Sequence, residues 1–317
     1  MEQALDKPAA PDPSQLPAEE SQEKGLARAV LPFVGQRLLF GAFVLVAIIY
    51  LVYVTFALAQ GATLATAVVE AVRQTFTYIA NLLQGDLGMS QPRSAAFRAQ
   101  PIMDILPVAL MRSLGLLAAT FGLATVVGIP LGIIAALRRH SRGALIILVV
   151  SFIGISTPVF FAALFLQIAA VEYTRTFGQS IVPVGGFGWD KHLILPVLVL
   201  AARPIAQITR VTFVAVSDVL DQDYVRVARG KGLRSYQILL VHIMRNSAIP
   251  ILTTMAITLR FVLSSLPVVE TYFGWGGLGE VLLRAIFLGD LNLTIAFLLL
   301  LGIIFILINI LLEVSYY

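Results

Sequence analysis

Six blocks of apolar residues, each longer than 20 residues, restrict the possible folds of this chain more than any other feature. A helix of about 20 apolar residues crosses the roughly 30 Å hydrocarbon core of a bilayer, and an open strand could not satisfy its backbone groups there. Only 13% of the residues are charged, whereas soluble domains carry about a quarter. The sequence therefore predicts an all-α integral membrane protein with six transmembrane helices, at residues 38–60, 113–137, 144–171, 193–216, 247–269 and 291–315.

The segments between these blocks divide the chain further. Residues 1–37 are rich in Pro, Ser, Gln and acids, which predicts a largely disordered tail. Residues 61–112 are expected on the outer side of the membrane, and residues 217–246 on the inner side. Connections of this length between helices are usually functional, so both segments are expected to have a role beyond joining two helices. Residues 113–317, with the last five helices, are expected to form the core.

The few basic residues indicate how the chain is oriented. Arg138, Arg139 and Arg142 place three cations within five residues, directly after a predicted helix. Short loops rich in Lys and Arg stay in the cytoplasm, so both termini are predicted to be cytoplasmic. The net charge is only +4 although the pI is about 9.5. Membrane topology accounts for these basic residues, and no nucleic-acid partner is expected.

Groups that usually carry catalysis or bind metals are scarce. There is no Cys, and none of the three His residues has a second His or a carboxylate four positions away. The string from Gly274 to Gly279 matches GxGxxG, but a predicted membrane helix precedes it where a dinucleotide site needs a strand. A tight outer turn is the better interpretation. No catalytic, metal or cofactor site is expected in this chain.

Charged residues in the interiors of the predicted helices are all arginines: Arg203, Arg210 and Arg260. A lipid-facing arginine at mid-membrane costs about 3 kcal/mol or more, so Arg260 should face a water-filled path or a partner, or else bond backbone carbonyls. Arg203 and Arg210 are seven positions apart and therefore lie on one face of their helix. The alternative role for Arg210 is to extend its side chain to the cytoplasmic edge of the membrane. The interiors of the predicted helices contain no Asp or Glu, which disfavours a proton-coupled transporter that works alone.

The inner segment 217–246 carries its own helix signals. Acids at Asp221 and Asp223 followed by cations up to Lys231 predict a short helix from about Asp221 to Lys231, with Gly232 as its terminator. Ser235 is a candidate N-cap for a second short helix toward Arg245. Two such helices would form a knob, and the small residues Ala228 and Gly232 would let another protein approach closely. The alternative is a solvated amphipathic loop.

This segment resembles a known family. The run Asp223–Leu233, followed by Arg245, Asn246 and Pro250, resembles the cytoplasmic coupling loop of ABC importer permeases of the dipeptide, oligopeptide and nickel family. The resemblance extends from about residue 31 to residue 315, is closest to the first of the family's two permease subunits, and implies the type I ABC importer permease fold. Further landmarks of the family are Gly85–Ser90, Gly128–Gly132, Pro183, His192–Pro196 and Val269–Thr271. Two positions depart from the usual importer patterns: Gly230 stands where Ala is common, and Arg226 stands where the general importer pattern has Glu.

The resemblance implies a permease subunit of an ATP-driven importer in a bacterial or archaeal inner membrane. Its expected partners are a second homologous permease, two cytoplasmic ABC ATPases that bind ATP and magnesium, and an extracytoplasmic substrate-binding protein. The expected cargo is di- and oligopeptides, with nickel chelates, glutathione and oligosaccharides as alternatives. A self-sufficient channel or secondary transporter, and an intramembrane enzyme, are the alternatives from other classes.

The resemblance also assigns roles to particular residues. The outer turn of Gly274, Gly277 and Gly279 is expected to face the binding protein, and the translocation path is expected to include Arg203, Arg260 and Glu270. The residues expected to couple the permease to the ATPases are Asp223, Tyr224, Arg226, Ala228, Arg229, Lys231, Gly232 and Leu233.

Overall fold

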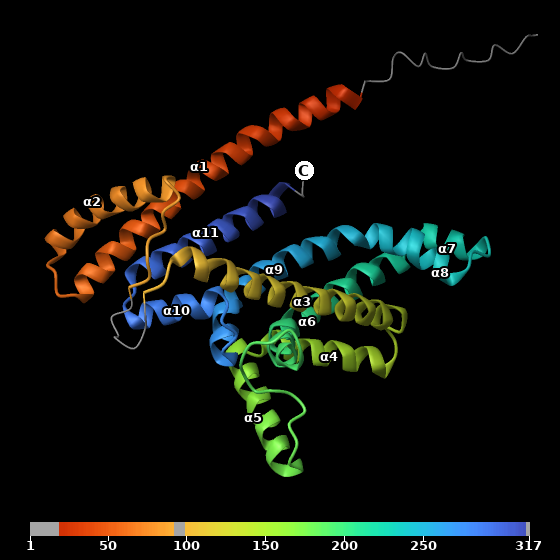
Figure 1. Ribbon diagram of the computed structural model, residues 1–317. Coiled ribbons are helices and arrows are strands. Elements are labelled where there is room, and N and C mark those ends of the chain that lie inside the picture. The colour runs from red at the N-terminus through yellow and green to blue at the C-terminus, as the bar shows by residue number, and fades with distance from the viewer. Residues whose placement is uncertain (1–18, 92–98, 315–317) are drawn as a thin grey trace, which may run out of the picture.

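The computed structural model describes residues 19–91 and 99–314, and the elements formed in this part of the chain are helices (Figure 1). Six of them are long and apolar enough to span a membrane, which confirms the predicted number. Each overlaps one predicted block. They are Val34–Ala59, Ile102–Leu137, Val159–Phe177, Lys191–Leu220, Ser235–Phe273 and Leu291–Ile310.

The first helix, α1 (Glu19–Ala59), begins well before the predicted span. The predicted disorder of residues 1–37 is therefore wrong for residues 19–37, and residues 1–18 lie outside the described part of the chain. Residues 19–30 are mostly Glu, Gln, Lys, Ala, Leu and Arg, which favour helix, and extending an existing helix needs no new nucleus. The predicted outer segment is also largely helical. It contains α2 (Leu64–Leu83), capped by Thr63, and the first turns of α3.

Helices α3 (Ile102–Leu137) and α6 (Ile194–Leu220) pack closely along their lengths, and α6 follows the short helix η2 (Lys191–Leu193). Two glycines, Gly128 and Gly132, make this contact possible. A Cβ atom on Gly132 would lie 2.5 Å from the Cβ of Thr212, so only glycine fits there. Small residues four apart let membrane helices approach closely. The Gly128–Gly132 landmark is therefore the crossing point of α3 and α6.

The predicted single span 144–171 is divided in two. Helix α4 (Arg142–Ser156) ends before Thr157, and α5 (Val159–Phe177) begins after Pro158. Proline lacks the backbone N–H that a helix needs and forces the preceding residue toward extended geometry. Thr157 accordingly has ψ 122°. In Figure 1, α5 projects away from the other helices at this break.

The inner segment contains one short helix rather than two. Helix α7 (Asp223–Gly230) is separate, but α8 (Ser235–Gln237) continues through a π-helical stretch, Ile238–Met244, into α9 (Arg245–Phe273). The predicted second short helix is thus the inner end of the fifth span, because no Gly or Pro interrupts the chain between Ser235 and Arg245. The N-cap is Arg234 rather than Ser235.

The outer end of α9 extends beyond the predicted span, and α10 (Leu278–Leu288) and α11 (Leu291–Val314) complete the described chain. Helix α9 therefore includes Glu270, in its last turn and one residue beyond the predicted span 247–269. Asp104 and Asp218 likewise lie in the end turns of α3 and α6. Figure 1 shows α1, α2 and α11 grouped on one side of the molecule, where α1 packs against both of the others.

Candidate functional site

Helix α7 rests on the inner ends of the membrane helices. Its buried side chains, Val225 and Ala228, join a hydrophobic cluster with Ala136 of α3, Val216 of α6 and Ile243 before α9. Positions three apart lie on one face of a helix, so this pair forms the seat of α7. A displacement of α7 would therefore act directly on three membrane-spanning segments.

The prediction that Ala228 helps a partner approach does not match its position. Ala228 is only 5% exposed, and it faces the cluster within its own chain. Its small side chain lets α7 lie close to the π-helical stretch Ile238–Met244. The face that remains available to a partner consists of the exposed side chains Asp223, Tyr224, Arg226, Val227, Arg229 and Lys231.

Helix α7 ends in a tight glycine turn, as its sequence predicted. Gly232 has φ +75°, and no atom would meet a Cβ placed there. The N–H of Gly232 donates to the carbonyl of Arg229 (3.0 Å), and the N–H of Leu233 donates to that of Ala228 (3.3 Å). This pair of bonds is the Schellman motif, which satisfies the last carbonyls of a helix. Leu233 is thereby held at the exposed end of α7.

Two further contacts fix the position of α7. Asn246, at the start of α9, donates through Nδ2 to the hydroxyl of Tyr224 (2.8 Å). Asp221, predicted to begin the helix, instead caps the end of α6. Both of its carboxylate oxygens accept hydrogen bonds from the guanidinium of Arg139, and this contact holds the pKa of Asp221 below its usual value of 3.8.

A second feature is a cavity of about 490 Å³ beside α6. Arg203, Gln207 and Arg210 line it from one face of that helix, together with Asp218 further along. The guanidinium of Arg203 lies over the ring of Phe261 at 4.0 Å, and its Nε is buried without a hydrogen-bond partner among the described residues. The structure thus brings Arg203 and Arg210 together. Gln207 was not predicted from the sequence, although it lies four positions after Arg203 and therefore on the same face of α6.

The other two residues predicted for the path lie elsewhere. Arg260 is in the middle of α9 with its Nε buried and without a partner in the described chain, but it does not line the α6 cavity. Glu270 is fully buried at the outer end of α9. Its carboxylate accepts hydrogen bonds from the hydroxyl of Ser113 (2.5 Å) and from the backbone N–H groups of Gly279 (2.7 Å) and Glu280 (3.2 Å). It therefore caps the N-terminus of α10.

The predicted outer glycine turn joins α9 to α10 around this carboxylate. Gly274 ends α9 with φ +61°, the left-handed geometry that glycine adopts without strain. Gly277 and Gly279 have ordinary φ angles, but a Cβ on Gly277 would collide with Glu270, and one on Gly279 with Pro267. The close backbone packing of this buried junction, rather than an open ligand site, explains the glycines.

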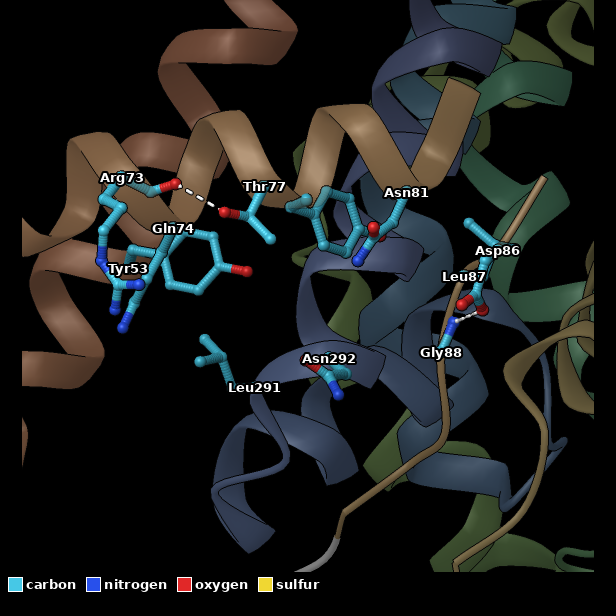
Figure 2. A pocket seen from close by; sticks show the side chains of 11 residues that line it. Tyr53, Arg73, Gln74, Thr77, Asn81, Asp86, Leu87, Gly88, Leu291 and Asn292 are labelled. Carbon is cyan, nitrogen blue, oxygen red and sulfur yellow. Dashed lines mark hydrogen bonds between the residues drawn. The ribbon is translucent and has the colours of Figure 1, made fainter. Parts of the chain in front are cut away.

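The outer segment forms a polar cavity of about 340 Å³ (Figure 2). The Gly85–Ser90 run closes one side of it, since the N–H of Gly88 donates to Asp86 Oδ1 (2.8 Å) and Asn292 of α11 donates to the carbonyl of Met89 (3.1 Å). Sequence analysis had singled out this run but not the residues facing it. The cavity is lined by Tyr53, Arg73, Gln74, Thr77, Tyr78, Asn81, Asp86, Leu87, Gly88, Leu291 and Asn292.

Comparison with known proteins identifies relatives over most of the chain. A glutathione transport system permease protein from Shigella flexneri serotype 5b is 35% identical over 244 residues, which cover 77% of this chain and 76% of that protein. A putative peptide transport system permease protein of Brucella suis biovar 1 is 34% identical over 257 residues and covers 77% of each chain.

A solved structure has the same fold. It is a structure of the MetNI methionine ABC transporter in inward-facing conformations. The two structures superpose with a TM-score of 0.53 at 17% sequence identity, over 68% of this chain and 96% of that one. Residues 128–317 match the family described as the binding-protein-dependent transport system inner membrane component. The predicted type I permease fold is thereby confirmed. This chain belongs to that family, and it is a multi-pass inner membrane permease subunit of an ABC importer with no catalytic role of its own.

Proposed function

We propose that this permease imports short peptides and that α7 is the segment through which ATP hydrolysis drives the transport. Permeases of this family work with ATPase and other permease subunits. The proposed complex contains a second homologous permease, two cytoplasmic ATPases that bind ATP and magnesium, and an extracytoplasmic binding protein that delivers the solute. Relatives named for glutathione and peptide transport support a peptide cargo, because glutathione is itself a tripeptide.

The position of α7 carries this proposal. It is a short helix outside the candidate spans, buried on one face by its own chain and exposed on the other. The exposed face mixes an aromatic ring, an apolar side chain and charges, a composition suited to a protein cleft. Because Val225 and Ala228 seat α7 on three membrane segments, movement of an ATPase that holds the exposed face would move the inner ends of those helices as a unit.

The α6 cavity supports a translocation path on this side of the protein. Arg203 and Arg210 each lie about 14–15 Å from the nearer end of α6, at 1.5 Å per residue. Two arginines near mid-membrane would be costly in lipid. Their face is therefore proposed to border a water-filled cavity next to the second permease, where the two guanidinium groups attract a peptide carboxylate. Arg260 remains a proposed member of the same path, although it does not line this cavity. Glu270, which is buried and caps α10, is proposed to stabilise that junction instead.

The coupling role is tested with Val227→Asp. Val227 is 56% exposed, on the face of α7 that points away from its own chain. The change should therefore leave folding intact and place an unpaired charge in the proposed ATPase contact. In proteoliposomes with the complete complex, we expect loss of trialanine uptake and of its stimulation of ATP hydrolysis. Val184→Asp, the same change in an exposed outer loop, is the matched control.

Two outcomes would contradict the proposal. Normal coupled uptake in the Val227→Asp variant would exclude α7 as the coupling segment. Wild-type uptake of trialanine without ATP would exclude ATP-driven import by this chain.

A further inference from the structure

Helix α2 has three different faces along its length. The buried face consists of Ala67, Ala71, Thr75 and Tyr78. The polar face consists of Glu70, Arg73, Gln74, Thr77 and Asn81. The apolar face is exposed and consists of Leu64, Val68, Val69, Val72, Phe76 and Leu83. At 3.6 residues per turn, the centres of the polar and apolar faces lie about 150° apart around the helix, so the two faces point in nearly opposite directions.

The buried face fixes the level of α2 relative to the membrane helices. Ala71 belongs to one hydrophobic cluster with Ile49 of α1, and Leu291 of α11 packs against this cluster. Ile49 lies in the outer half of the candidate span Val34–Ala59, and Leu291 is the first residue of the candidate span Leu291–Ile310. Helix α2 therefore lies beside the outer ends of two membrane helices, at the boundary of the hydrocarbon region.

The polar face of α2 borders the polar cavity of the outer segment. Figure 2 shows Arg73, Gln74, Thr77 and Asn81 around this cavity. Glu70 accepts hydrogen bonds from the guanidinium of Arg73 and from Nε2 of Gln74. Glu70 and Arg73 are the charged residues of α2, so both charges are paired and lie on the face opposite to the apolar one.

The apolar face has no cover from the rest of the described chain. Leu64, Val69 and Phe76 are 65%, 73% and 70% exposed. Helix α2 packs chiefly against α1, and Figure 1 shows it at the edge of the molecule, away from α6. The second permease is proposed to lie beside the α6 cavity, and α6 packs against α3, α4, α5 and α9 rather than against α2. The apolar face therefore lies on a part of the surface remote from the proposed contact between permeases.

The surroundings of α2 favour contact with lipid. A helix with one polar and one apolar face lies in the interface of a bilayer, with the apolar face buried about 5–10 Å into the boundary with the acyl chains. Only residues 60–63 separate α2 from the end of the first membrane helix, so α2 stays close to the membrane surface. Exposure of such a continuous apolar face to water would be unfavourable, whereas acyl chains at this level would cover it.

We propose that α2 is an interfacial helix embedded in the outer leaflet. Its apolar face contacts the acyl chains, and its polar face lies toward the headgroups and the polar cavity. The run Gly85–Ser90 follows α2 directly and is bonded to α11 through Asn292 and the carbonyl of Met89. Contact of α2 with lipid therefore helps to hold this run at the outer end of α11. The interaction does not depend on which solute the protein carries.

The test uses single cysteines, because the chain has no cysteine of its own. Phe76→Cys and Thr77→Cys are a matched pair, since the two positions are adjacent, exposed and on opposite faces. Each variant carries a nitroxide label in the complete transporter, whose other subunits have serine in place of cysteine, in vesicles of phosphatidylcholine and phosphatidylglycerol. Electron paramagnetic resonance then measures collisions of the label with oxygen, which concentrates among acyl chains, and with a nickel chelate, which stays in water.

We expect the ratio of oxygen to nickel collisions to be several-fold higher at position 76 than at position 77. Val69→Cys should give the same high ratio, which shows that the result does not depend on loss of the Phe76 ring. Nickel collisions at positions 69 and 76 as frequent as those at position 77 would show that the face lies in water and would overturn the proposal. Infrequent collisions with both reagents at positions 69 and 76 would show that another subunit covers the face, which would overturn it as well.

Discussion

Arg139 and Asp221 form a two-point hydrogen bond, with Nη1 to Oδ2 at 2.8 Å and Nη2 to Oδ1 at 2.6 Å. The pair joins the α3–α4 connection to the end of α6, two residues before α7 begins. A paired guanidinium and carboxylate have a fixed relative orientation. This contact therefore sets the direction in which α7 leaves the membrane helices.

We expect Arg139→Gln and Asp221→Asn to weaken coupling without preventing assembly, because both groups lie at the surface. Stimulation of ATP hydrolysis by trialanine should fall several-fold in each variant, and no further in the double variant. Additive losses would show that the two residues act separately. Arg142→Gln, on a neighbouring arginine outside this pair, is the control.

The same pair predicts little pH dependence near neutrality. The hydrogen bonds from Arg139 lower the pKa of Asp221 below 3.8, so the stabilisation is present above that value and is lost as the pH falls through the lowered pKa. Coupling should therefore not change between pH 6 and pH 8 through this contact. A titration of coupling in that range that disappears in Asp221→Asn would contradict the assignment.

Two neighbouring glycines in the coupling segment should respond in opposite ways to alanine. Gly230 is helical and has open space around it, so Gly230→Ala should stabilise α7 by up to about 1 kcal/mol. Gly232 needs its positive φ, so Gly232→Ala should cost about 1 kcal/mol and loosen the Schellman turn. Hydrogen exchange of the α7 amides in the intact complex should slow in the first variant and accelerate in the second. Equal changes in hydrogen exchange in the two variants would show that an alanine side chain at position 232 does not strain the turn.

Glu270 is predicted to act on stability rather than on solute recognition. Glu270→Ala would leave the hydroxyl of Ser113 and two backbone N–H groups without an acceptor, at a cost of about 3 kcal/mol or more. Glu270→Gln keeps one oxygen and should cost less. Thermal unfolding of the complex should follow this order. If both variants unfolded like the wild type and lost transport, Glu270 would instead belong to the translocation path.

Arg210 is predicted to recognise the carboxylate of the cargo. Arg210→Gln should reduce ATP-driven uptake of trialanine about tenfold, with a smaller effect on trialanine amide, because it removes one charge-assisted hydrogen bond. Arg210→Lys should restore part of the uptake, and Arg175→Gln, at an exposed outer position, should have no effect. Uptake is normalised to the fraction of each peptide held by the binding protein.

Two other outcomes would show which part of the Arg210 prediction is wrong. An equal loss for both peptides, together with reduced assembly, would show that Arg210 pairs with an acid of the second permease. No trialanine uptake by the wild type would instead remove the peptide cargo, whatever the role of Arg210.

Much of the architecture could be predicted because lipid imposes strict rules. A block of more than 20 apolar residues has few alternatives to a membrane helix, so the six spans follow from the pattern alone. The break between α4 and α5 follows from Pro158, which is visible in the sequence. The predicted span 144–171 ignored it because the pattern of apolar residues carries no information about the backbone geometry that a proline imposes. The helix over residues 19–37 was missed because composition says little about helix growth from a span that has already formed.

The sequence by itself determined the spans, their number, the glycine end of α7 and the family. Only the tertiary structure decided which face of each helix is available. It turned Ala228 toward its own chain, used Glu270 to cap α10, and brought Arg203 and Arg210 to one cavity while leaving Arg260 outside it. The physical reason is that spacing along one helix fixes which residues share a face, whereas packing against other helices decides what that face contacts.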